Sequence, residues 1–79
     1  MATTINEQIK VGAVFEKEII RPKWFVHNGR KHAVEEITYT WKTCEGDAQL
    51  IHFSVTEGGT LFEISYNQKT LTWLLEKVE

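Results

Sequence analysis

Closely spaced turn signals constrain this chain more than any other feature of its sequence. Glycine and asparagine supply the positive φ angles that tight turns require, and the segments between them are rich in Val, Ile, Thr, Tyr, Phe and Trp, which favour strands. The signals are Asn28-Gly29, Glu45-Gly46-Asp47, Gly58-Gly59 and Asn67-Gln68. This spacing predicts an all-β fold, a single antiparallel meander of five to six strands.

The turn types set the expected register of the strands. We treat Asn28-Gly29 as a type I′ hairpin turn, Gly58-Gly59 as a two-residue loop and 44–46 as a three-residue loop with a bulge. The expected strands are about 23–27, 30–43, 48–56, 60–66 and 70–77. The expected pairs are Phe25 with His32, Ile37 with Phe53, Tyr39 with Ile51, Phe53 with Ile64, Val55 with Phe62, Tyr66 with Leu71 and Ile64 with Trp73.

The three later registers agree in dividing the side chains between an apolar and a polar face, which a one-residue slip at any turn would destroy. The apolar face holds Ile37, Tyr39, Trp41, Ile51, Phe53, Val55, Phe62, Ile64, Tyr66, Leu71, Trp73 and Leu75. The polar face holds Thr38, Thr40, Lys42, His52, Ser54, Glu63, Ser65 and Thr72.

The large apolar face needs a cover, and the sequence contains no long amphipathic helix to supply one. We therefore expect the sheet to curl into a small barrel or roll, or to pair with a second copy. The strand 30–43 is long enough to bend and serve two sides, with a bulge at Glu35-Glu36, where the apolar alternation breaks.

Two segments permit alternatives. The spacing of Leu71, Leu74, Leu75 and Val78 also fits a helix, although the strand register supplies matched partners. Residues 5–20 fit a strand with its apolar side chains inward, or a helical turn after Thr4. The inward set would be Ile9, Val11, Ala13 and Phe15. We expect Pro22 to separate this segment from the next strand, because proline is poorly tolerated in a paired strand.

Length and charge limit the class of protein. The 79 residues predict one small domain, 1–79, with 1–12 as a candidate for loose order. Nine Lys and Arg against eleven Asp and Glu give a formal charge of −2, which provides no general attraction to nucleic acid or anionic membranes. Cys44 is the only cysteine, and no secretory signal or membrane-length apolar stretch is visible. These features predict a cytoplasmic protein.

The residues with catalytic or metal-binding potential do not form a recognisable pattern. The three histidines and Cys44 lack the clustered spacing of zinc ligands. Glu35 and Glu36 are adjacent on a strand and point to opposite faces, and no phosphate-binding loop or Ser-His-acid pattern is legible. We therefore expect neither an enzyme nor a cofactor or metal site.

One basic segment of the chain indicates a binding partner through its charge. Residues 21–32 carry four cations and no acid, so the remainder of the chain sums to −2 − 4 = −6. The candidate ligand surface is Arg21, Lys23, Phe25, His27, Arg30, Lys31 and His32. Basic and aromatic groups are interleaved in this way in proteins that bind single-stranded nucleic acid. The alternative is that Trp24 belongs to the core, Phe25 covers a barrel end and the charges keep an edge hairpin soluble.

A wider pattern resembles a known family. It runs Phe25-x-x-x-Gly29-Arg30-x-x-x-Val34-x-Glu36, Trp41, His52-Phe53-x-Val55, Phe62-Glu63-Ile64-x-Tyr66-Asn67, Trp73-x-Leu75 and Val78. The pattern is similar to that of small bacterial all-β domains of unknown function, over about residues 21–79. His27 and His32 depart from it, because the family tends to have tryptophan or arginine and an aromatic residue there. The resemblance implies the fold and no catalytic residue.

These observations predict a non-catalytic protein-interaction or accessory module. Its partner would be an unknown protein or a second copy, bound at an edge strand at 15–20 or 70–77 or at the basic hairpin. The alternative is a nucleic-acid-binding module that uses residues 21–32.

Overall fold

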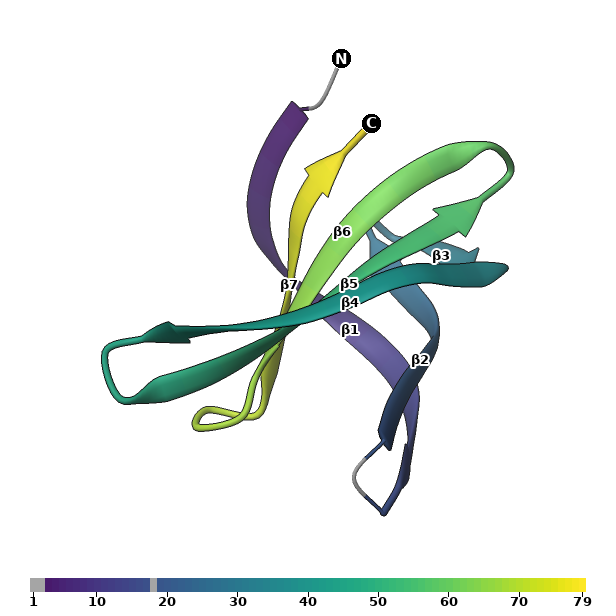
Figure 1. The fold of residues 1–79 in the computed structure, drawn as a ribbon. Helices are drawn as coiled ribbons and strands as arrows, with labels where there is room; N and C mark the ends of the chain where they lie inside the picture. Colours follow the sequence, from purple (N-terminus) through teal and green to yellow (C-terminus); the bar gives the residue numbers. More distant parts are fainter. Residues whose placement is uncertain (1–2, 18) are drawn as a thin grey trace.

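The computed structural model describes residues 3–17 and 19–79, and these residues form one antiparallel sheet of seven strands (Figure 1). The strands are β1 (Thr3–Glu16), β2 (Ile19–His27), β3 (Arg30–Ala33), β4 (Glu36–Glu45), β5 (Ala48–Glu57), β6 (Thr60–Asn67) and β7 (Thr72–Val78). Their order in the sheet is β3-β2-β1-β7-β6-β5-β4. The predicted all-β antiparallel meander is confirmed. The first strand, β1, pairs with the last strand, β7, and this pairing joins β1–β3 and β4–β7 into one sheet.

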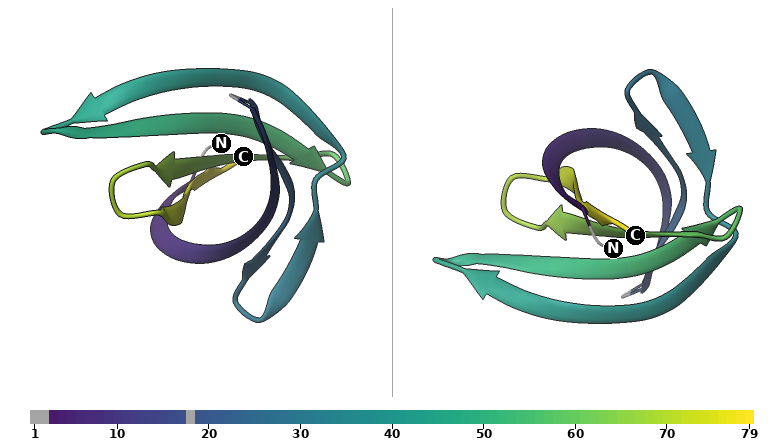
Figure 2. Two further views of the ribbon diagram at one scale, coloured as in Figure 1. Left: turned by 90° about the horizontal axis from the view of Figure 1, so that it is seen from below. Right: turned by 90° about the horizontal axis from the view of Figure 1, so that it is seen from above.

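The sheet curls because β3 and β4 are consecutive in the chain yet lie at opposite ends of the strand order. Only Val34-Glu35 separates them, so the two sheet ends approach each other and form a curled half-barrel (Figure 2). The Val34 amide donates to the Lys23 carbonyl at 2.9 Å and the Glu35 amide to the Thr56 carbonyl at 2.9 Å. The strand expected over 30–43 is therefore interrupted at Val34-Glu35, beside the predicted position of the bulge, and the bulge itself lies at Thr38.

The inner face of the half-barrel holds the core. Most of the predicted apolar face is buried there: Ile51, Phe53, Val55, Phe62, Ile64, Tyr66, Trp73 and Leu75. Ile37 packs against this cluster. Three predicted members lie elsewhere, because Tyr39 and Leu71 are 66% and 69% exposed and Trp41 is half-buried on the outer face.

The turn after β4 and a bulge within β4 together explain the two aromatic errors. The turn after β4 is the two-residue Gly46-Asp47, not the expected three-residue loop, and Ile37 faces Val55. Tyr39 then faces Ser54, so Thr38 is one extra residue in β4. An extra residue reverses the alternation of side chains along a strand. Ile37 therefore points inward while the two aromatic side chains that follow point outward.

The other hairpins are close to the prediction. Phe25 faces His32 and Phe53 faces Ile64, as expected. Across the β6–β7 turn, Tyr66 faces Trp73 rather than Leu71, a shift of two residues. A two-residue shift preserves the face of each side chain, so the buried set of β7 was still correct.

Proline 22 does not end a strand, contrary to the prediction. It lies within β2, buried and opposite Ala13. The register changes from Gly12 opposite Trp24 to Ala13 opposite Pro22, which leaves Lys23 as the extra residue of a bulge. Bulges are among the few positions where a paired strand accepts proline.

Both ambiguous segments are strands. β1 covers Thr3–Glu16, including the part of 1–12 that the structure describes, and Ile9 is buried in the core. β7 is a strand and not a helix, and it lies between β1 and β6. The expected free edge at 70–77 is therefore wrong, because β7 is paired on both sides. None of the described residues forms a helix that is long and apolar enough to cross a membrane.

Candidate functional site

β4 combines a free sheet edge with exposed aromatic side chains. It is the last strand in the sheet order, so β5 is its partner strand and its other edge is unpaired among the described residues. Tyr39 and Trp41 project from it on the outer face, with their ring centroids 5.4 Å apart. An unpaired edge is where an added strand would hydrogen-bond, and the two rings lie beside it.

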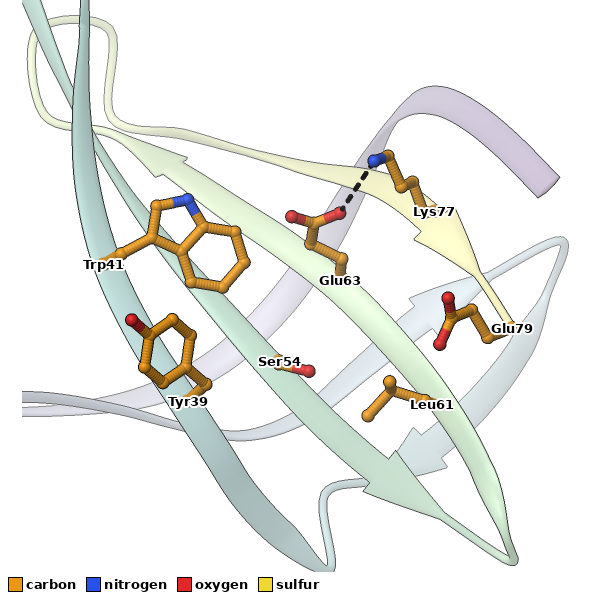
Figure 3. Close-up of a pocket in the computed structure, with 7 residues that line it drawn as sticks. All are labelled: Tyr39, Trp41, Ser54, Leu61, Glu63, Lys77 and Glu79. Carbon is orange, nitrogen blue, oxygen red and sulfur yellow. Dashed lines mark ion pairs between the residues drawn. The ribbon is translucent and has the colours of Figure 1, made fainter. Parts of the chain in front are cut away.

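The two rings form one wall of a shallow pocket of about 260 Å³ (Figure 3). The lining residues come from β4 to β7 and the residue after β7: Tyr39, Trp41, Ser54, Leu61, Glu63, Lys77 and Glu79. Figure 3 shows the rings on one side, with the Glu63–Lys77 ion pair and Leu61 on the other. The ion-pair atoms are 3.8 Å apart, in a setting where Lys77 is half exposed. The pocket thus offers apolar contact together with polar groups of both signs.

A polar cluster from β4 to β7 packs against the face of the Trp41 ring through His52. His52 stacks on it with centroids 5.0 Å apart and planes 6° apart. The His52 Nε2 is 2.7 Å from the Thr43 Oγ1, and the Ser65 hydroxyl donates to the Glu76 carboxylate at 2.6 Å. These contacts fix the imidazole, so the indole is oriented before any ligand arrives.

Thr43, His52 and Glu76 have the chemical types of a nucleophile, a base and an acid, but the contact between the base and the acid is too long for a hydrogen bond. The Glu76 Oε2 lies 3.9 Å from the His52 Nδ1, beyond hydrogen-bond distance. That Nδ1 is buried and has no hydrogen-bond partner among the described residues. Because the carboxylate instead accepts from Ser65, we interpret the cluster as support for Trp41 rather than as a catalytic group.

The predicted basic surface is divided by the structure. Phe25 is completely buried, stacked on His32 with centroids 4.9 Å apart and edge-on to Phe62 at 5.1 Å. His32 Nδ1 lies 2.6 Å from a Glu57 oxygen, and His27 Nε2 lies 2.9 Å from a Glu7 oxygen. The Phe25, His27 and His32 rings serve packing and hydrogen bonding, so the Phe25 ring is not available to stack on a ligand.

The remaining four residues of that surface are exposed cations. They are Arg21, Lys23, Arg30 and Lys31. The Lys31 Nζ lies 4.8 Å from the centroid of the Trp24 ring, a cation–π contact. The basic hairpin therefore presents charge without an exposed stacking ring from the predicted set.

Glu57 is the titratable group whose environment is most clearly altered. The hydrogen bond with His32 lowers the pKa of Glu57 below its ordinary 4.5, burial opposes this, and the Ala33 amide and the charges of His32 and Arg30 lower it further. The Ala33 amide donates to the second carboxylate oxygen at 3.1 Å. These contacts join the β2–β3 hairpin to the end of β5. Within 3–17 and 19–79, no group of three or more His, Cys, Asp or Glu is placed to hold a metal ion.

Sequence reasoning missed the β4 pocket because it expected the wrong turn after β4. The two-residue turn Gly46-Asp47 sets Tyr39 opposite Ser54 and Trp41 opposite His52, on the outer face, and the extra residue Thr38 then lets Ile37 point inward. One signal for the outward placement of the rings was available in the sequence. In the segment Thr38–Thr43, threonine or lysine alternates with the aromatic residues, so either face of this strand could have been the buried one.

Comparison of the chain with protein-family models, curated proteins and solved structures found no match. The resemblance to small bacterial all-β domains therefore stays a prediction.

Proposed function

We propose that this domain is a non-catalytic interaction module that binds an extended segment of a protein partner along β4. The observation that carries the proposal is the position of Tyr39, which is 66% exposed beside Trp41 on an edge strand. Large exposed aromatic rings are enriched where proteins bind partners.

The backbone and the side chains of β4 would contribute differently. The unpaired edge of Glu36–Glu45 can hydrogen-bond to an added strand whatever its sequence. The pocket would select one side chain of that strand, an apolar or aromatic group placed between the two rings and Leu61. A flanking polar group would meet Glu63 and Lys77.

A selection from displayed random peptides tests this proposal. We expect enriched sequences with a hydrophobic residue in an extended context, and Tyr39→Ala should weaken their binding roughly tenfold. Phe15→Ala is the matched control, because Phe15 is an aromatic residue of similar exposure, 57%, outside the β4 pocket. Peptide binding should also slow amide hydrogen exchange in β4.

Two results would contradict the proposal. Enriched peptides that bind the Tyr39→Ala variant as well as the wild type would exclude the pocket as the site. A concentration-dependent mass above 9.2 kDa that disappears in the same variant would show that β4 pairs with a second copy instead.

Nucleic acid is the alternative ligand, supported by the exposed cations of the basic hairpin. A tryptophan-fluorescence titration with short single-stranded DNA and RNA at two salt concentrations tests it. If nucleic acid is the ligand, binding weakens as salt rises, and an Arg30→Gln/Lys31→Gln variant binds more weakly with a smaller salt dependence. Equal binding by this variant would remove the hairpin from consideration.

The proposal includes a cytoplasmic location and a bacterial origin, the latter drawn from the family resemblance. The exposed free thiol of Cys44 is compatible with a reducing compartment.

A further inference from the structure

The open end of the half-barrel carries three of the exposed large apolar side chains of the described residues. The end of β1, the start of β2 and the β6–β7 turn lie at this end (Figure 1). Phe15 is 57% exposed, Ile19 53% and Leu71 69%. Phe15 also contacts Tyr66 edge-on, with centroids 5.7 Å apart, which holds the end of β1 against β6. Concentrated apolar exposure of this kind marks binding surfaces.

Two adjoining pockets open at this end, on the inner face of the sheet. Their volumes are about 530 Å³ and 230 Å³, and they share Ile20, Lys42 and Ile51. The larger pocket has a volume typical of small-molecule sites. We call the two pockets together the mouth.

The register of the β4–β5 hairpin creates the mouth as well as the outer pocket. Because it places Tyr39 and Trp41 on the outer face, Thr40 and Lys42 take the inner positions opposite Phe53 and Ile51. A threonine and a flexible lysine fill less of the inner face than two aromatic rings, so the core remains open there.

The charge of the mouth has one sign. Lys17 and Lys42 line the larger pocket, Lys42 also lines the smaller one, and their remaining described lining side chains are apolar or neutral. Apolar side chains combined with lysine residues in one lining complement a molecule that has an aliphatic chain and a single anionic head.

We propose that the mouth binds a medium-chain aliphatic carboxylate, with the chain against Phe15, Ile20, Ile51 and Tyr66 and the carboxylate at Lys42. This inference goes beyond the proposed function and is independent of it. The mouth lies on the inner face of the sheet, whereas the β4 pocket lies on the outer face.

Calorimetric titration of the full chain with octanoate, decanoate and dodecanoate, all below their micelle concentrations, tests the proposal. Each added methylene should tighten binding about fourfold, as expected for a buried chain. Dodecyltrimethylammonium, which has the same chain and the opposite charge, should bind more weakly than dodecanoate. Methyl resonances of Ile20, Ile51 and Leu71 should shift on binding, while those of Leu61 in the outer pocket stay constant.

Charge variants separate the ion pair from the apolar contact. Lys42→Met keeps the aliphatic length and should weaken carboxylate binding about two- to fivefold without weakening that of the cationic probe. Lys10→Met is the matched control, because Lys10 is an exposed lysine that does not line the mouth.

Three results would overturn the proposal. The first is no binding of dodecanoate, and the second is equal binding of the anionic and cationic probes. The third is a protein dimer by light scattering that dissociates in a Phe15→Ser variant, which would show that a second copy covers the mouth. None of these results bears on Tyr39, so the proposed function is tested separately.

Discussion

The two ends of the half-barrel are built from the same kinds of apolar residues but differ in how far these residues are covered. At the closed end, Phe25 and Val55 are completely buried, and β3 pairs with the part of β2 that contains Phe25. At the open end, Phe15 and Ile19 are more than half exposed. The difference follows from the short β3, which pairs with Trp24–His27 and does not extend along the first residues of β2. Stability is therefore concentrated at one end and accessible surface at the other.

Truncation of a phenylalanine at each end tests this contrast most strongly. Phe25→Ala removes a completely buried ring and should lower the free energy of unfolding by about 3–5 kcal/mol. Phe15→Ala removes a ring that is 57% exposed and should cost less than about 1 kcal/mol. Urea unfolding followed by tryptophan fluorescence measures both. Equal losses would show that the open end is packed as tightly as the closed end.

The glycine between the two ends should be the next most sensitive position. A Cβ at Gly12 would lie 2.1 Å from the Trp24 ring, which crosses this position at the β2 bulge. Gly12→Ala should therefore cost about 1–3 kcal/mol of unfolding free energy. In a Trp24→Ala background the same substitution should cost far less, and a double-mutant cycle measures the difference. Additive costs would exclude the ring contact as the cause.

The closed end should also respond to acid through Glu57. The pKa of this carboxyl is lower in the folded chain than its ordinary 4.5. Its ionised form therefore stabilises the fold above pH 4.5, and this stabilisation is lost as the pH falls through the pKa of the folded chain. Glu57→Gln should be less stable than the wild type near neutral pH, and the difference should close below about 4.5. Unfolding at several pH values measures this. A stability difference between Glu57→Gln and the wild type that is the same at every pH would exclude the carboxylate charge as its cause.

The smallest expected effect is at the β6–β7 turn of the open end. Leu71 has a φ of 60° while 69% of it is exposed, so it adopts a left-handed conformation with little burial to offset the cost. Leu71→Asn should raise the unfolding free energy by about 0.5 kcal/mol, because asparagine tolerates this conformation. Leu71→Val, with a branched Cβ, should lower it. A gain from valine would mean that backbone strain is not the controlling factor.

Local signals accounted for most of the fold. Asn28-Gly29 and Gly58-Gly59 predicted both the turns and the registers that they set, because each requires backbone angles that few other residues adopt. The bend between β3 and β4 was also predictable, since the apolar alternation breaks there. Seven strands formed where five to six were expected, because the strand 30–43 divided at the bend and residues 3–16 formed β1.

The candidate sites were less predictable because they depend on contacts distant in sequence. The basic hairpin was visible in the sequence, but the burial of Phe25 follows from its contact with Phe62, more than 30 positions away in the numbering of the chain. Likewise, His27 and His32 meet Glu7 and Glu57 only in the folded sheet. The Tyr39–Trp41 pocket was missed altogether, since the expected three-residue loop at 44–46 assigned both rings to the wrong face and no local pattern revealed the extra residue Thr38.

The sequence by itself determined the class of fold and the hairpins at Asn28-Gly29 and Gly58-Gly59, because these depend on local backbone preferences and on the period of two along a strand. Only the tertiary structure decided which side of β4 faces inward. The length of the β4–β5 turn and the bulge at Thr38 together make that choice, and the packing of the whole sheet selects between the outcomes. The same decision opens the mouth on the inner face and exposes Tyr39 on the outer face.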